Sequence, residues 1–144
     1  MNDTVAKNVA GYIWEIANCV GIFDETHIHI VPGNHDLDRK AGIREDLVRG
    51  IYPDYQDKLS NGNVDEATLS SSRIKHLVTA FSFFHSLLYS LYSENRAKKI
   101  WDSMQNEIHY YTESNSQFNI LCMNTAIMSV EESENERGKL VVSY

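Results

Sequence analysis

Asn34, His35 and Asp36 are the residues of this sequence best suited to chemistry. They offer a neutral amide oxygen, an imidazole and a carboxylate in three consecutive positions. Pro32 and Gly33 stand directly before them and predict a tight turn, because both residue types interrupt regular structure. Glycine at this place lets the backbone come close to a ligand or adopt a positive φ. Such a turn can present all three polar side chains to one ligand.

Two predicted elements position this turn. Between Val5 and Val20 the apolar residues recur at helical spacing, which predicts an amphipathic helix with Asp3 or Thr4 as N-cap and Gly21 as its stop. The β-branched, alternating residues 26–31 predict a short strand that ends at the turn. Helix, strand and a polar loop at the strand's carboxyl end form the unit of layered α/β sheets, which bind ligands beyond those ends. We therefore expect the turn to carry the chemistry.

The remainder of the chain predicts helices and a hairpin. Residues 38–59 favour a weaker, charged helix, and residues 70–92 have the widest apolar face in the sequence, which predicts one long covered helix. A short helix should carry residues 100–104. Residues 108–123 predict a β-hairpin whose second strand is buried on both faces. The acidic run 131–136 is expected to be a solvated loop.

Length and composition limit the class of protein. The chain has 144 residues, the size of one domain, and a net charge of −7, which argues against a broad electrostatic grip on nucleic acid or anionic lipid. The polar, acidic N-terminus does not resemble a signal peptide, and no apolar run is long enough to span a membrane. Cys19 and Cys122 lie in apolar stretches without metal-type spacing. We therefore expect reduced, buried thiols in a cytoplasmic protein.

The turn and its surroundings resemble the calcineurin-like metallophosphoesterase family, whose third signature is Gly-Asn-His-Asp or Gly-Asn-His-Glu directly after a buried strand. The likeness covers Val5–Asp38 well. It extends loosely to residues 108–125, where an aromatic-rich strand, an apolar strand and Asn-Thr follow the family's order. The resemblance implies an α/β fold, namely part of a layered β-sandwich flanked by helices. Residues 1–37 would form the helix, strand and motif loop, 38–105 a largely helical insertion, and 106–144 a hairpin and acidic tail.

The resemblance also implies a reaction and a role for each residue of the motif. Members of the family hydrolyse phosphoesters with two divalent metal ions, here manganese, iron, zinc or magnesium. Asn34 would ligate one metal, and its neutral oxygen adds no charge that would repel phosphate. His35 would contact the phosphate and protonate the departing oxygen, while Gly33 and Asp36 support the loop. Arg39 is a candidate contact to substrate phosphate, with an ordinary surface arginine as the alternative.

Other motifs of the family are missing from this sequence. It contains no Asp-x-His, no Gly-Asp-x-x-Asp and no Gly-His-x-His. We therefore expect an internal piece of a longer enzyme that lacks the ligands for two metals and is inactive alone. The substrate would be a phosphomonoester or phosphodiester, with nucleotides and nucleic acid included, and no membrane is involved. Exposed strand edges and helix faces of such a piece should promote self-association.

Several alternatives remain open at this point. His27 and His29 share one face of the predicted strand and could bind a metal, although ordinary sheet-face histidines explain them as well. His85 and His109 are expected to be packed, and His76 to face solvent. The aromatic residues of 81–92 are explained by a helix core or by a base-stacking platform.

Two other classes of function compete with the metallophosphoesterase hypothesis. The dipeptide His35-Asp36 also occurs in HD phosphohydrolases, but there it lies on helices, which Pro32 and Gly33 disfavour. The second rival is a non-catalytic cap or protein-interaction module, in which the long helix and its partner provide the docking surface. Motifs in the flanking coding sequence would discriminate, because only the enzyme needs Asp-x-His and Gly-Asp-x-x-Asp.

Overall fold

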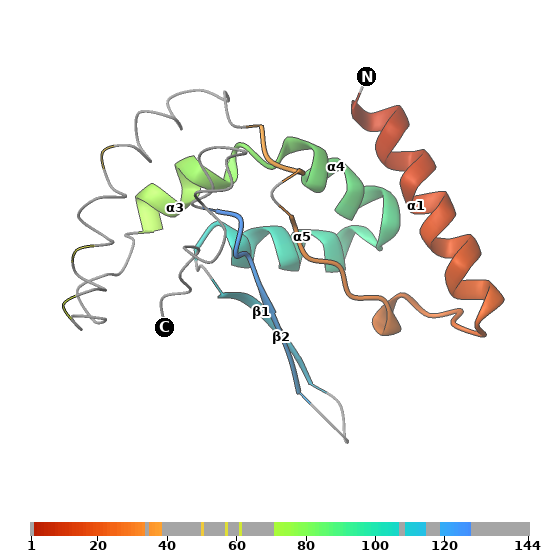
Figure 1. Ribbon diagram of the computed structural model, residues 1–144. Helices are drawn as coiled ribbons and strands as arrows, with labels where there is room; N and C mark the ends of the chain where they lie inside the picture. Colours follow the sequence, from red (N-terminus) through yellow and green to blue (C-terminus); the bar gives the residue numbers. More distant parts are fainter. Residues whose placement is uncertain are drawn as a thin grey trace.

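The structure is a computed structural model that describes residues 2–33, 35–38, 50, 57, 61, 71–106, 109–114 and 119–127. Along the chain its elements are α1 (Asn2–Cys19), the 3₁₀ helix η1 (Glu25–His27), α3 (Ser71–Val78), α4 (Ser82–Leu91), α5 (Glu94–Met104), β1 (His109–Ser114) and β2 (Asn119–Met123) (Figure 1). The acidic loop expected over 131–136 lies outside the described residues, and so does the helix expected over 38–59 apart from residues 38, 50 and 57.

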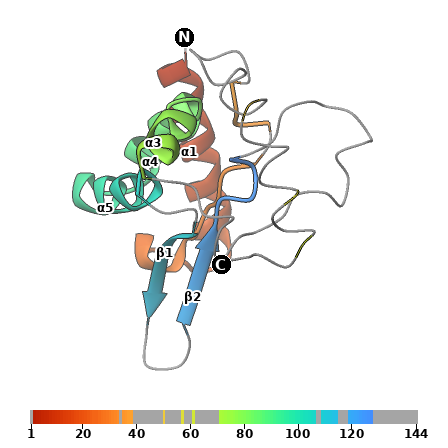
Figure 2. The same ribbon diagram turned by 90° about the vertical axis from the view of Figure 1, so that its left-hand side faces the viewer.

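Helix α1 packs one face of small residues against α4. Ala6, Ala10 and Ala17 are buried there, and their short side chains let the two helices approach closely. The indole Nε1 of Trp14 donates to the carbonyl of Leu91 at 3.1 Å, so it satisfies a carbonyl at the C-terminal end of α4. Figure 2 shows α4 between α1 and α5, which makes it the central helix of the fold.

The two ends of α1 test the predicted caps. Asp3 and Thr4 lie inside the first turn, so the expectation that one of them is the N-cap is wrong; the Asp3 carboxylate instead accepts a hydrogen bond from Ser86 on α4 at 2.7 Å. Gly21 stops the helix as predicted, with φ at +82°. Its N–H donates to Asn18, and the N–H of Ile22 donates to Ala17, which together form a Schellman motif.

The long helix expected over 70–92 is divided into α3 and α4, so that prediction is wrong. The N–H groups of Ala80 and Phe81 donate three residues back, which tightens the chain and ends α3. The carbonyl of Ala80 is then available to accept a hydrogen bond from the N–H of Asp38 at 2.9 Å. Asp38, which is distant in sequence, therefore takes part in the break between α3 and α4, and helix propensity contains no information about such a contact.

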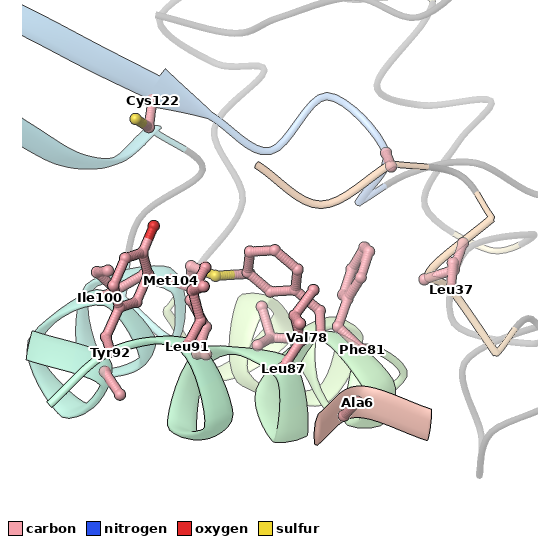
Figure 3. Close-up of a cluster of buried hydrophobic side chains, with 14 of the residues drawn as sticks. Ala6, Leu37, Val78, Phe81, Leu87, Leu91, Tyr92, Ile100, Met104 and Cys122 are labelled. Atoms are coloured by element: carbon pink, nitrogen blue, oxygen red, sulfur yellow. The ribbon is translucent and has the colours of Figure 1, made fainter. Parts of the chain in front are cut away.

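The core lies where α3, α4 and α5 meet. Its largest fully buried side chains come from all three helices and from the break between α3 and α4: Phe81, Phe84, Leu77, Leu88, Ile100, Met104 and Val78. Figure 3 shows this cluster facing the segments that carry Leu37 and Cys122. The short helix predicted around residues 100–104 is confirmed as the second half of α5.

The predicted hairpin is present, and β1 pairs antiparallel with β2. It projects away from the helices in both views (Figures 1 and 2). The expectation that β2 is buried on both faces is wrong, because Leu121 is 54% exposed while Cys122 is 4% exposed. Within the described ranges the sheet has two strands and one covered face.

The segment predicted as a strand over 26–31 begins differently. Residues 25–27 form η1, because the carboxylate of Asp24 caps the turn by accepting from the N–H of Thr26 at 2.8 Å. Ile28 then turns to an extended conformation, and no strand among the described residues pairs with 28–33. The described part is therefore mostly helical with one antiparallel hairpin, and the layered sandwich stays a prediction.

The two cysteines differ in their surroundings. Both are free thiols, but Cys122 is buried and Cys19 is exposed, so the expected burial is wrong for Cys19. Cys19 lies on the side of α1 that turns away from α4. Among the helices that the structure describes, none combines the length and apolarity needed to cross a bilayer.

Candidate functional site

Two hydrogen bonds between Gly33 and Asp36 close a turn at the surface. The N–H of Gly33 donates to the Asp36 carboxylate at 2.8 Å, and the N–H of Asp36 donates back to the Gly33 carbonyl at 3.1 Å. His35 is exposed at the tip, whereas Pro32 and Leu37 on either side are buried. The turn therefore presents an accessible imidazole on a backbone that is anchored at both ends. Asn34 and Arg39 lie outside the described residues.

The segment that leads into the turn is held by the junction of α4 and α5. The hydroxyl of Tyr92 donates to the carbonyl of Ile28 at 3.0 Å, and this bond is buried. The Arg96 guanidinium lies 5.0 Å from the centre of the Tyr92 ring and also reaches the Ile28 carbonyl, at 3.4 Å. These contacts fix the extended chain five residues before Gly33.

A second contact reinforces this anchor at the start of α5. The Glu25 carboxylate accepts from both the N–H and the hydroxyl of Ser93, at 2.6 and 2.7 Å. Ser93 is the N-cap of α5, so the carboxylate also lies at the positive end of that helix. The contact ties η1 to α5 just ahead of the extended segment.

The segment that leaves the turn is held by the break between α3 and α4. Leu37 is buried in the same cluster as Phe81, and the N–H of Asp38 donates to the Ala80 carbonyl. The helical region 71–106 thus holds both sides of the motif turn. Sequence reasoning treated this region as an insertion and missed its positioning residues, Tyr92, Arg96 and Ala80. No local pattern signals them, because the contacts join residues more than forty positions apart.

Gly33 does not have the backbone conformation that sequence reasoning allowed for it. Among the described residues the one glycine with positive φ is Gly21. A Cβ added at Gly33 would lie 3.7 Å from Oδ2 of Asp36, an ordinary van der Waals distance. The turn itself therefore tolerates a side chain at this position, and close approach of a ligand stays a prediction.

Among the described histidine side chains, His27, His76 and His85 lie on three different elements, η1, α3 and α4, while the side chain of His109 lies outside the described residues. His27 lies in η1 and is exposed, so the expected arrangement of His27 and His29 on one strand face is not formed. His85 packs between Tyr89 and Trp101, with ring centres 4.7 and 4.5 Å away. Burial lowers the pKa of His85, and the nearby Asp3 carboxylate partly opposes this shift. His76 is exposed, as expected.

Metal-ligating side chains are sparse in the described part of the chain. No group of three or more His, Cys, Asp or Glu side chains there is close enough to hold a metal ion. On the turn itself, His35 is accessible, while one carboxylate oxygen of Asp36 is engaged by Gly33. The described residues alone therefore do not complete a two-metal centre.

Asn124 is a buried polar residue that sequence reasoning did not single out as a site. It directly follows β2 and is 2% exposed, and within the described part of the chain neither its amide oxygen nor its amide nitrogen has a hydrogen-bond partner. Leaving a buried amide unsatisfied costs about 1–3 kcal/mol. The sequence did contain one sign of this residue, because a polar Asn-Thr pair directly follows an apolar strand. The family resemblance included that pair only as the end of a strand pattern and gave Asn124 no role.

None of the family models, curated proteins or solved structures with which the chain was compared matches it. The assignment of a function therefore depends on the motif and on the geometry of the turn.

Proposed function

We propose that this chain contributes the Gly33–Asp36 turn to a two-metal phosphoester hydrolase of the calcineurin-like type. The observation that carries the proposal is the exposed His35 at the tip of a turn whose neighbours, Pro32 and Leu37, are buried. A catalytic group needs this combination of access to substrate and a rigid support. A turn packed into the interior would have left no room for a phosphoester.

Each residue of the motif has a chemical part in this proposal. The amide oxygen of Asn34 would hold one metal ion, and the metals, when bound, supply a hydroxide nucleophile and neutralise phosphate charge. His35 would donate a proton to the departing oxygen, as a positioned general acid. Asp36 maintains the turn through its bonds to Gly33. The remaining metal ligands must come from outside the described residues.

The proposed substrate is a phosphomonoester or phosphodiester, and a nucleotide or nucleic acid belongs to that class. The net charge of −7 disfavours a broad electrostatic surface for a polyanion. A phosphate would therefore be recognised locally by the metals and by His35, with Arg39 as a further candidate contact.

The first test is to read the coding sequence on either side of this chain. The proposal requires Asp-x-His and Gly-Asp-x-x-Asp in the same polypeptide, and their absence there would contradict it. The 144-residue chain alone, titrated with Mn²⁺, should not hydrolyse p-nitrophenyl phosphate. Turnover at the rate of a complete enzyme would show that the missing ligands are not needed.

The second test uses the polypeptide that carries all the motifs. His35→Asn should lower kcat for p-nitrophenyl phosphate or its bis ester by about 10²–10⁴-fold, with a smaller change in KM. His76→Asn, which alters an exposed histidine on α3, is the matched control and should leave kcat unchanged. Equal kcat values for the two variants would refute the role of His35.

A non-catalytic interaction module is the second candidate. It is favoured by one specific observation, the exposed apolar side chains along α1, of which Tyr12 and Ile16 are 65% and 68% exposed. The HD phosphohydrolase alternative has less support, because His35 and Asp36 lie in a turn rather than on a helix. An interaction module predicts that no flanking metal-binding motifs are found.

A further inference from the structure

One side of α1 carries a row of apolar side chains that the fold leaves open to solvent. Val5, Tyr12 and Ile16 on the helix are 48–68% exposed, and Val20 and Phe23, which follow the end of the helix, are 70% and 77% exposed. The half-buried Val9 and the exposed Cys19 lie in the same row. We call these seven residues the α1 stripe. The stripe is separate from the buried face of α1, since Ala6, Ala10 and Ala17 lie roughly a third of a turn further round the helix.

The spacing of the α1 stripe is that of a helix-pairing seam. Val5, Val9, Tyr12, Ile16 and Cys19 are separated alternately by four and three residues. This spacing averages 3.5 residues, which keeps one row of side chains facing a neighbouring helix along its whole length. An ordinary surface helix, by contrast, has polar residues wherever it does not meet its own core.

No charged side chain interrupts the stripe. The exposed residues Lys7 and Gly11 lie on the polar side of α1, whereas Asn8 and Glu15 border the stripe beside Tyr12. A partner that fits this surface must therefore be an apolar face of similar length, about 27 Å for 18 residues.

We infer that the α1 stripe is the contact between two copies of this chain, with the two α1 helices packed antiparallel about a two-fold axis. The exposed side chains of the stripe would bury about 600 Å² per copy, or about 1,200 Å² in all, which reaches the lower range of stable interfaces. A two-fold contact needs only this one surface, because the same patch serves both copies.

The antiparallel arrangement also matches the sizes of the side chains. With the axis at the level of residue 14, Tyr12 faces Ile16 of the second copy, and Val9 faces Cys19. Beyond the end of the helix, Phe23 lies near Val5. Each pair then sets a larger side chain against a smaller one, and the helix dipoles oppose one another favourably. A parallel pair would place identical side chains together at every level.

Oligomeric state tests this inference. Sedimentation equilibrium of the 144-residue chain should give a mass that rises toward twice that of one chain between about 1 and 200 μM. Added salt should strengthen the dimer, because the net charge of −7 on each copy opposes association through charges outside the stripe. A wild-type chain that stays monomeric at the highest concentration overturns the inference.

A matched pair of variants locates the contact. Ile16→Lys places a charge in the stripe and should weaken dimerisation at least tenfold, whereas Gly11→Lys places the same charge on the polar side of α1, where an added side chain has open space, and should not. Val20→Lys provides a second change in the stripe. Far-UV circular dichroism checks that all three variants fold. A dimer that survives both Ile16→Lys and Val20→Lys overturns the proposed surface.

Disulfide crosslinking tests the direction of pairing. In the antiparallel dimer the two Cys19 residues lie roughly 15 Å apart along the axis, so wild type should not crosslink. Val9→Cys places a thiol opposite Cys19 of the second copy, and copper phenanthroline should oxidise this pair with loss of two electrons and two protons. A wild-type crosslink through Cys19 overturns the antiparallel arrangement; loss of the variant's crosslink on adding Cys19→Ser supports it.

Discussion

Replacing Tyr92 by phenylalanine tests whether the helical region holds the motif turn. The change removes one hydroxyl and keeps the ring, so the packing in the core and the contact with Arg96 are retained. What is lost is the buried hydrogen bond from Tyr92 to the carbonyl of Ile28. This bond is one of the contacts that hold the segment leading to Gly33.

The size of the effect follows from what remains at the Ile28 carbonyl. Arg96 Nη2 lies 3.4 Å from the same oxygen, so the carbonyl keeps a weak donor after the change. We therefore expect a loss of about 1 kcal/mol in the free energy of unfolding rather than the full penalty for an unsatisfied buried group. For a domain of this length that corresponds to a fall in Tm of about 3 °C.

The assay is urea unfolding followed by circular dichroism, with Tyr89→Phe as the matched control. Tyr89 is 40% exposed, so removal of its hydroxyl should change stability by less than about 0.5 kcal/mol. Amide hydrogen exchange should also become faster at Gly33 and Asp36 in the Tyr92 variant, because the turn would open more often.

A double-mutant cycle with Arg96→Met measures whether Tyr92 and Arg96 share the Ile28 carbonyl. Tyr92→Phe should cost more in the Arg96→Met background, by about 0.5–1 kcal/mol, since the Ile28 carbonyl then lacks both donors. Strict additivity, or a stability for Tyr92→Phe equal to that of the Tyr89 control, would refute the view that these side chains hold the turn.

Three further predictions follow from single residues. Asn124→Leu should raise the free energy of unfolding by about 1–3 kcal/mol, because it replaces an unsatisfied buried amide with an apolar group of similar size; destabilisation in urea unfolding would mean that the amide has a partner. Gly21→Ala should lower the free energy of unfolding by about 1–2 kcal/mol, because Gly21 has a positive φ that alanine adopts only with strain. Gly33→Ala, measured in the same thermal unfolding experiment, should change it by less than about 0.5 kcal/mol. Similar losses in the two variants would contradict the turn geometry. Burial lowers the pKa of His85 below its ordinary 6.5, so the unfolded chain binds this proton at a higher pH than the folded chain does. The free energy of unfolding should therefore fall as the pH drops below about 6.5, and His85 should not change it above that pH. His85→Gln should reduce this acid-side slope in unfolding experiments between pH 5 and 7, and an unchanged slope would show that other groups cause it.

The sequence by itself determined the elements whose signals are local. Apolar residues at helical spacing predicted α1, and the glycine at position 21 predicted where it ends, because left-handed backbone favours that residue. The second half of α5 and the two strands of the hairpin were likewise predicted from periodicity and turn residues. The motif at 33–36 was also visible, since its residues are adjacent in the chain.

Tertiary structure alone decided how that motif is held and which surfaces are covered. The break between α3 and α4 involves a hydrogen bond from Asp38, and the extended segment at Ile28 is held by Tyr92 and Arg96. These contacts join residues far apart in sequence, so neither propensity nor periodicity contains them. The same reason explains the exposure of Cys19 and Leu121: an apolar residue shows that burial is favourable, but only the arrangement of neighbouring elements decides whether a covering surface exists.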